Sequence, residues 1–169
     1  VASKSMLPIN GIPMVLRVLK ALAESDSIGL RLLCGPSQSV IQQSDELQSS
    51  IANANISWIQ NEITPSLSAV KAFQIIPETS PVLLTTADHA MLSSRIVDYF
   101  CREAVKLGVD VVAGLAYRNL VISAYSETKR TALKLKDDAF CSCNLFAFLT
   151  PQARKAAQFW LQVENQRKN

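Results

Sequence analysis

One short apolar run of this sequence ends abruptly in an acidic residue. The run covers residues 81–87, Pro-Val-Leu-Leu-Thr-Thr-Ala, and Asp88 and His89 follow it directly. Its length and bounding residues predict a buried strand, and open α/β sheets bind ligands at the edge where the carboxyl ends of their strands lie. A carboxylate there is a natural ligand for Mg²⁺, which proteins hold with one or two carboxylates and substrate phosphates. The alternative role of Asp88 is to cap the next helix.

The length and composition are those of one compact domain. The chain has 169 residues, of which 49% are hydrophobic and 18% charged, and the apolar residues fall in short runs. No run approaches the roughly 20 apolar residues that a membrane span needs. The first residues lack the charged-then-apolar order of a secretory signal, so we expect a cytoplasmic protein. They also lack an initiator Met, and we expect them to begin inside a longer chain.

The four cysteines do not have the spacing of a metal site. Cys141 and Cys143 are too close together for a paired zinc motif, Cys34 and Cys101 are isolated, and His89 is the single histidine. We expect buried thiols in a reducing compartment. The net charge of +3 is mild, the basic residues are spread out, and aromatic residues make up only 7%. These properties argue against a nucleic-acid partner.

The strand before Asp88 belongs to an alternating series of predicted elements. Apolar residues at helical spacing, Val15, Val18, Leu19 and Leu22, predict a helix that opens near Pro13. Further helices are predicted over 66–76, from Ser93 to Gly108 and from Pro151 to Val163, with a surface helix and loop over 38–50. Strands are predicted over 28–34, 55–59, 81–87, 109–115, 129–135 and 144–149. In the helix after Ser93, we expect Ile96, Phe100 and Ala104 to face inward and Asp98 to pair with Arg102.

Short strands that alternate with helices predict an α/β fold with a mostly parallel sheet. The second half of the chain is less regular than the first. It indicates one antiparallel addition to that sheet.

Five segments resemble a known enzyme family. Residues 4–14, Lys-Ser-Met-Leu-Pro-Ile-Asn-Gly-Ile-Pro-Met, are similar to a K-x-L-x-x-x-G-x-P stretch that opens the first helix, and Thr64-Pro65-Ser66-Leu67 before a helix resembles an S-L helix start. Lys129-Arg130-Thr131, Cys143-Asn144-Leu145-Phe146 and Arg167-Lys168 resemble a downstream pattern of one bacterial branch. In this order they resemble MobA-like nucleotidyltransferases, which have a Rossmann-like three-layer α/β/α fold of the nucleotide-diphospho-sugar transferase type. The resemblance implies a single nucleotidyltransferase domain over residues 1–169.

The sequence departs from that family at two places. The glycine-rich loop of G-G-x-S-x-R-M type, which cradles the triphosphate after the family's first strand, is absent. The sequence starts where that loop would end, so we expect the first strand and the loop to lie upstream. Ser142 stands where the branch has glycine, and its Cβ could crowd backbone that must approach a ligand.

The resemblance assigns catalytic roles to three residues. Lys4 would bring a cation to the phosphates, Asp88 would hold Mg²⁺, and Asn144 would fix the metal or the acceptor. The ordinary alternatives are a solvated surface lysine for Lys4 and an amide that satisfies strand-edge backbone for Asn144.

The same resemblance assigns the binding residues. The nucleotide would contact Lys4, Asp88 and the helix start formed by Pro65, Ser66 and Leu67, and Ser66 would act through its hydroxyl or its N–H while also capping the helix. The acceptor would contact His89, Lys129 and Arg130. The last two alternatively form a solvated strand face, and a lone histidine at a strand end more often hydrogen-bonds backbone.

These roles imply an Mg²⁺-dependent transfer of a nucleoside monophosphate from an NTP to a small phosphorylated or hydroxyl acceptor, with release of pyrophosphate. The molybdopterin guanylyltransferase-like class would use GTP. A glycosyltransferase of the same fold is one alternative, although its usual D-x-D pair is reduced here to Asp88 alone. A non-catalytic nucleotide-binding module is another. We expect no nucleic-acid or membrane partner, and a homodimer is possible.

Overall fold

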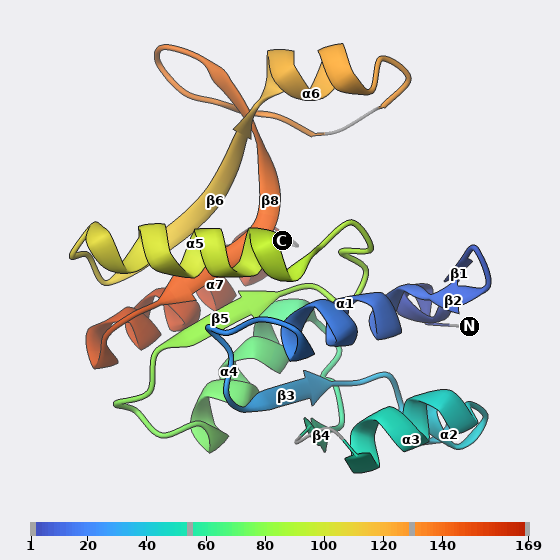
Figure 1. Ribbon diagram of the computed structural model, residues 1–169. Coiled ribbons are helices and arrows are strands. Elements are labelled where there is room, and N and C mark those ends of the chain that lie inside the picture. The colour runs from blue at the N-terminus through green and yellow to red at the C-terminus, as the bar shows by residue number, and fades with distance from the viewer. Residues whose placement is uncertain (1–2, 54–55, 129–130, 168–169) are drawn as a thin grey trace.

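The computed structural model describes residues 3–53, 56–128 and 131–167 (Figure 1). Its helices are α1 (Met14–Ala23), α2 (Gln38–Gln42), α3 (Asp45–Asn53), α4 (Pro65–Ile75), α5 (Ser94–Lys106), α6 (Arg118–Ala124) and α7 (Arg154–Arg167), with 3₁₀ turns η1 (Lys4–Met6) and η2 (Pro151–Ala153). Its strands are β1 (Pro8–Ile9), β2 (Ile12–Pro13), β3 (Arg31–Cys34), β4 (Ile56–Ile59), β5 (Val82–Thr85), β6 (Val111–Tyr117), β7 (Leu133–Lys134) and β8 (Ala139–Phe148).

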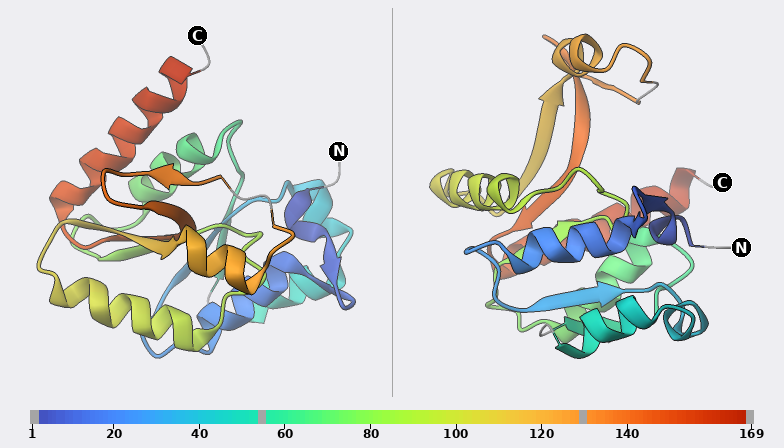
Figure 2. Two further views of the ribbon diagram at one scale, coloured as in Figure 1. Left: turned by 90° about the horizontal axis from the view of Figure 1, so that it is seen from above. Right: turned by 45° about the vertical axis from the view of Figure 1, so that its right-hand side comes forward.

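Helices cover the strands from two sides. Figure 2 shows α1 and α5 on one side of the strands and α4 and α7 on the other. The packing agrees, because Val18 and Ala21 of α1 share a buried cluster with Val97 of α5, whereas Phe73 of α4 packs with Ala157 of α7. The predicted α/β class with helices on both sides is therefore observed.

The prediction of one mostly parallel sheet is wrong. Among the described strands, only β3 and β4 pair in parallel. β5 and β6 both pair antiparallel with β8, in the order β5-β8-β6, and β7 adds to β8 near its start. The reason is the direction of β8, whose ten residues lie between β5 and β6 and run antiparallel to both. The predicted antiparallel addition is thus the central strand of the larger sheet.

Three apolar clusters form the core of the described part of the chain, and α1 contributes to two of them. Val15, Leu16 and Leu19 pack with Leu33, Leu47 and Ile56 under β3 and β4. Val18 and Ala21, on the neighbouring side of α1, pack with Leu92, Val97 and Leu145. The helical stripe predicted from Val15, Val18 and Leu19 therefore faces two halves of the fold at once.

A hairpin of two strands and a helix lie where no element was predicted. β1 and β2 form a hairpin around Asn10-Gly11, both at positive φ, which is the signature of a two-residue type I′ turn. The Asn-Gly pair is its sequence signal. α6 follows β6 and forms, with β7 and the start of β8, an arm that stands away from the body of the molecule (Figure 1). The predicted strand 129–135 is reduced to β7, and Lys129 and Arg130 lie outside the described residues.

The expected pattern on α5 holds only in part. Ala104 is buried and Phe100 packs against the second cluster, but Ile96 is 43% exposed instead of facing inward. Asp98 does not pair with Arg102. It accepts hydrogen bonds from the Ser25 hydroxyl at 2.6 Å and the Ser27 N–H at 3.1 Å, whereas Arg102 bonds Glu103. Asp98 thereby connects α5 to the turn after α1.

Candidate active site

Asp88 lies in a tight turn at the carboxyl end of β5. The strand ends at Thr85, two residues before its predicted end at Ala87, and hydrogen bonds from His89 N to Thr86 O and from Ala90 N to Asp88 O close the turn. Asp88 does not cap α5, since that cap is the Ser93 hydroxyl, which accepts from Ile96 N. The capping alternative for Asp88 is therefore wrong.

An ion pair joins Asp88 to the start of the chain. The Lys4 Nζ donates to Asp88 Oδ2 at 2.7 Å. Both residues are positioned by their neighbours, because Met6 of η1 and Ala87 before Asp88 pack against the same apolar cluster. The Lys4 side chain is 75% exposed and the Asp88 side chain 28% exposed, so the pair faces solvent on one side. The predicted nucleotide and metal residues Lys4 and Asp88 are thus brought together.

The pKa of the Asp88 carboxyl is below its ordinary value. The hydrogen bond from Lys4 is the main cause, and a hydrogen bond from the Thr86 side chain acts in the same direction. Partial burial opposes both, because it disfavours the charged form. Asp88 is consequently an anion throughout the neutral range. Thr86, which lies within the apolar run before Asp88, was not predicted as a site residue.

His89 points back to the strand. Its Nδ1 lies 3.3 Å from the Thr85 hydroxyl, which fixes the ring next to Asp88. A histidine so placed has the ordinary role of a hydrogen-bonded residue at a strand end, and it also lies beside the carboxylate.

Asn144 occupies an irregular point of β8 near the same edge. Leu145 pairs with Thr85, the last residue of β5, so Asn144 continues β8 at the end where β5 leads to Asp88. The register with β6 shifts between Ala113 and Leu115, and Asn144 has a φ of 52°. This bulge turns the Asn144 backbone out of the regular ladder, as is common beside binding sites.

Ser142, where glycine was expected, is engaged with Asn144. The Ser142 hydroxyl accepts from Asn144 N at 3.1 Å and lies 3.5 Å from its side-chain oxygen. The side chain thus supports the bulge. No positive φ is needed at this position, since Asn10 and Asn144 are the non-glycine residues with positive φ in the described part of the chain.

The predicted nucleotide residues Pro65, Ser66 and Leu67 form the first turn of α4. Thr64 is the N-cap, and its hydroxyl accepts from Leu67 N at 3.2 Å. Ser66 is therefore not the cap. Its side chain is 1% exposed and its Oγ lies 3.1 Å from Thr64 Oγ1, so the hydroxyl points into the protein.

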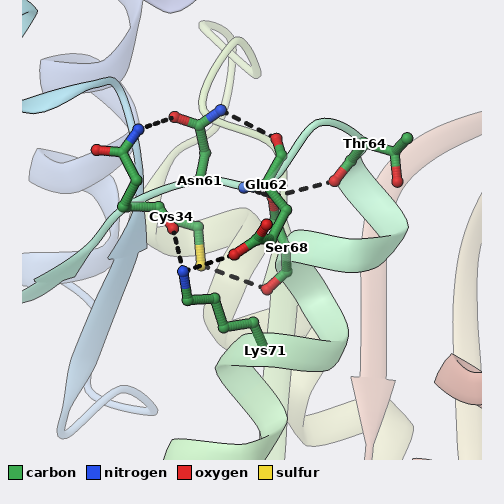
Figure 3. A network of polar contacts seen from close by, with 7 residues as sticks. Cys34, Asn61, Glu62, Thr64, Ser68 and Lys71 are labelled. Atoms are coloured by element: carbon green, nitrogen blue, oxygen red, sulfur yellow. Dashed lines mark hydrogen bonds and ion pairs between the residues drawn. The ribbon is translucent and has the colours of Figure 1, made fainter.

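A polar network ties this helix start to β3 and to the loop after β4 (Figure 3). The Ser68 hydroxyl accepts from Glu62 N at 2.9 Å and donates to Thr64 O at 3.0 Å. Lys71 pairs with Glu62 at 2.6 Å, and the Cys34 thiol, at the end of β3, donates to Ser68 O at 3.7 Å. None of these residues was predicted from the sequence as a site residue. The sequence feature that could have pointed to them is the predicted start of this helix, since they belong to its cap and first turns or contact them.

Gly35 is required where β3 ends. Its φ of 75° is unfavourable for other residues, and a Cβ there would lie 3.0 Å from Asn61 side-chain atoms. The two chain segments at the carboxyl ends of β3 and β4 thus run in close contact.

These groups lie at one edge of the strands. β3 and β5 point the same way in Figure 1, toward the side on which η1 lies. Lys4 contacts Asp88, and His89 follows Asp88 in sequence. Asn144 lies near the same end of β5, because its neighbour Leu145 pairs with Thr85. The start of α4 lies at the end of β3. The predicted acceptor residues Lys129 and Arg130 lie outside the described residues.

The described residues hold no group of three or more His, Cys, Asp or Glu side chains arranged for a metal ion. All four cysteines are free thiols, and burial raises the pKa of Cys34 and of Cys101. None of the described helices combines the length and apolar character needed to cross a membrane.

Known proteins resemble this chain in sequence and fold. A family profile of the MobA-like NTP transferase domain matches residues 2–135. A solved structure described as a hypothetical transferase from Thermus thermophilus has 23% sequence identity and a TM-score of 0.72, over 100% of this chain and 66% of that one. The structure of CMP:2-keto-3-deoxy-manno-octonic acid synthetase complexed with CTP has 13% identity and a TM-score of 0.66, over 96% and 72%.

No curated protein sequence gives a significant match. The chain spans just under two thirds of the length of the Thermus protein, and at these identities the two structures establish a shared fold. The family profile covers most of the chain, including the turns that carry Lys4 and Asp88. This protein belongs to the family of MobA-like NTP transferase domains.

Proposed function

We propose that this protein transfers a nucleoside monophosphate from an NTP to a small phosphorylated or hydroxyl acceptor, in an Mg²⁺-dependent reaction that releases pyrophosphate. The observation that carries the proposal is the Lys4–Asp88 pair at the carboxyl end of β5. It combines an exposed cation that can bind phosphates with an anion that can bind a metal ion, at the sheet edge where α/β proteins bind ligands. The family membership supports the same reaction class.

The residues present fit an ion that arrives with its substrate. Asp88 supplies one carboxylate, and the described residues hold no cluster of protein ligands around it. Mg²⁺ is commonly held by one or two carboxylates and completed by substrate phosphates and water. Asp88 would hold it, with the Asn144 side chain nearby at the bulge of β8. When bound, Mg²⁺ would neutralise phosphate charge that develops during transfer.

The reaction needs positioning and charge neutralisation more than a covalent nucleophile. An acceptor oxygen forms a bond to the α-phosphorus, the bond between that phosphorus and the bridging oxygen breaks, and its electrons leave with pyrophosphate. Lys4 would bind the β- and γ-phosphates and stabilise the leaving pyrophosphate. For this, its ammonium must exchange the Asp88 oxygen for phosphate oxygens, which its high exposure allows.

The remaining site residues would orient the two substrates. The first turn of α4 would present Leu67 and the backbone of Pro65 and Ser66 to the nucleoside, since the Ser66 hydroxyl is turned inward. His89, held by Thr85, would contact the acceptor, as would Lys129 and Arg130. The free thiols are consistent with a reducing, cytosolic setting, which is part of the proposal.

The experiment is calorimetric titration of the purified protein with each of the four NTPs, with Mg²⁺ and with EDTA. We expect micromolar binding of one NTP that is lost in EDTA. Asp88→Asn should remove the metal-dependent part of the affinity. The matched control is Glu78→Gln, because Glu78 is exposed and lies before the opposite end of β5.

Each outcome decides between reaction classes. Metal-dependent binding of one NTP identifies the donor and its base. Binding of a nucleotide sugar but of no NTP would indicate the glycosyltransferase alternative. Nucleotide binding by a folded protein that forms no pyrophosphate with any acceptor would indicate a non-catalytic module. Equal affinities of Asp88→Asn and the parent protein in Mg²⁺ would remove Asp88 from the site.

A further inference from the structure

The outer edge of β6 is unpaired among the described strands. β6 is the last strand in the order β5-β8-β6, so β8 pairs with one of its edges and no described strand pairs with the other. Figure 1 shows β6 on the outer side of β8, where it rises into the arm that carries α6. At seven residues, β6 is long for an exposed edge.

This edge carries none of the features that keep edge strands from pairing. The sequence of β6 is Val-Val-Ala-Gly-Leu-Ala-Tyr, without a charged residue, a proline or a polar side chain other than the tyrosine hydroxyl. Proteins protect exposed edges with lysines, prolines, bulges or short strands, because a free row of N–H and C=O groups accepts another strand. The register shift between β6 and β8 coincides with the positive φ of Asn144 in β8. Gly114 of β6 has no positive φ, so the backbone of β6 stays extended.

One face of β6 is both apolar and exposed. Exposure alternates along the strand, and the exposed residues are Val111, Ala113, Leu115 and Tyr117. The other face is covered, since a Cβ on Gly114 would lie 3.3 Å from Phe100 of α5. Ala113 pairs with Phe146, whose ring lies 5.7 Å from that of the partly exposed Trp160, so the apolar surface continues onto α7.

The charges at the two ends of β6 are complementary under a two-fold axis. Asp110 immediately precedes the strand and Arg118 immediately follows it, and both are exposed, while Asp110 Oδ1 accepts a hydrogen bond from the Thr150 hydroxyl at 2.5 Å. Along a strand, every second residue points its N–H and C=O groups toward the same edge. When two copies of that edge pair antiparallel, the two-fold axis therefore passes through a residue and not between two residues. Pairing centred on Gly114 matches all seven residues. It also sets Asp110 against Arg118 of the second copy at both ends.

We propose that β6 pairs antiparallel with β6 of a second copy of this chain, about a two-fold axis at Gly114, to form a sheet that continues through a homodimer. In this register Val111 lies opposite Tyr117 and Ala113 opposite Leu115 of the other copy. A two-fold contact is isologous, so each favourable pair occurs twice. The central register is the one that brings Asp110 and Arg118 together; centres at Ala113 or Leu115 place Asp110 against uncharged residues.

Sedimentation equilibrium over a range of protein concentrations tests the proposal through charge exchange. We expect a dimer for the parent protein. Asp110→Lys sets like charges against each other at both ends, as does Arg118→Asp, and each should weaken the dimer about tenfold. The double variant exchanges the charges and should recover an affinity within about threefold of the parent. Lys20→Asp, on the exposed side of α1, gives the same change of charge as Arg118→Asp and should leave the dimer unchanged.

A second variant tests the strand itself. Leu115→Lys introduces a charge at an exposed position, so the fold should persist while the dimer is lost. Circular dichroism and thermal unfolding of every variant separate loss of the dimer from loss of the fold. A parent protein that is monomeric at all concentrations would overturn the proposal. So would a dimer in which the double variant is no better than either single one, since the contact would then lie elsewhere.

Discussion

The ion pair between Lys4 and Asp88 controls the charge at the candidate site. A carboxyl whose pKa is lowered in the folded state stabilises the fold above its unfolded pKa, and this stabilisation is lost as the pH falls through the folded pKa. The contribution here is small, because Lys4 is largely exposed and water screens the pair. The pair therefore matters for ligand binding more than for stability.

Replacement of Lys4 should change the titration of Asp88. Lys4→Ala removes the main cause of the lowered pKa, so we expect the pKa of Asp88 to rise toward its ordinary value. Without Lys4, partial burial favours a higher pKa of Asp88 and the Thr86 hydrogen bond opposes it. An NMR titration of the carboxyl carbon between pH 2 and 7 measures the change, with Lys20→Ala as the control. An unchanged pKa would mean that the pair does not persist in solution.

The same variant tests which phosphates of the nucleotide Lys4 contacts. If Lys4 binds the β- and γ-phosphates as proposed, Lys4→Ala should weaken triphosphate binding about tenfold or more and monophosphate binding much less. Calorimetry with NTP and NMP, in the presence of Mg²⁺, gives both affinities. Equal losses for the two nucleotides would show that Lys4 does not touch the outer phosphates.

The types of these residues were predictable from the sequence, whereas their contacts were not. Asp88 stands out because an apolar run precedes it, but its partner Lys4 is 84 residues away in sequence. The two meet where Met6 and Ala87 pack against the same apolar cluster, a contact that no local pattern reveals. The N-cap of α4 was predictable in principle. Proline is favoured in the first turn of a helix, so Pro65 points to Thr64, rather than Ser66, as the cap.

At the scale of elements, α4 is fixed at both ends. Thr64 caps its start, and at its end the Arg154 guanidinium of α7 donates to the carbonyls of Phe73, Ile76 and Pro77. The last carbonyls of a helix have no partner within the helix, and Arg154 supplies one for them. Its side chain also lies 5.3 Å from the centre of the Phe73 ring. This arrangement positions the helix whose first turn faces the candidate site.

Arg154→Ala should therefore destabilise the protein by about 2–3 kcal/mol, since it removes charge-assisted hydrogen bonds from partly buried carbonyls. Arg154→Lys should recover only part of this loss, because an ammonium cannot reproduce the planar fork of a guanidinium. Urea unfolding followed by circular dichroism gives both values. Arg118→Ala, an exposed arginine on the arm, is the control. A loss below about 0.5 kcal/mol for Arg154→Ala would contradict the capping role.

Elements with strong local patterns were predictable, and those made by distant pairing were not. α1, α4, α5 and β5 follow from apolar spacing, caps and prolines close in sequence. β8 was expected over 144–149 but begins at Ala139, because its first residues are stabilised by pairing with Tyr117 and Leu133, which no local pattern reveals. α6 has no buried residue and so lacks the apolar stripe that marks a helix in sequence.

At the scale of the whole molecule, α1 connects the two halves of the core. Its residues contribute to the cluster under β3 and β4 and to the cluster between α5 and β8. The parallel pair β3–β4 and the larger sheet do not share a ladder in the described part of the chain. The sequence could predict that α1 is amphipathic, but not that its buried side serves two separate groups of strands.

This connection predicts that the chain unfolds as one unit. Leu19→Ala should lower the free energy of unfolding by about 3 kcal/mol, because Leu19 is buried and leaves a cavity at the centre of the fold. The two tryptophans report on different regions, since Trp58 packs against the first cluster and Trp160 against Phe146. We expect single-tryptophan proteins, Trp58→Phe and Trp160→Phe, to give coincident fluorescence transitions in urea, and Leu19→Ala to shift both to the same lower concentration. Lys20→Ala, on the exposed side of α1, should shift neither by much. A shift of the Trp58 transition alone would mean that the parallel pair with its helices unfolds separately, and that the chain consists of two cooperative units rather than one domain.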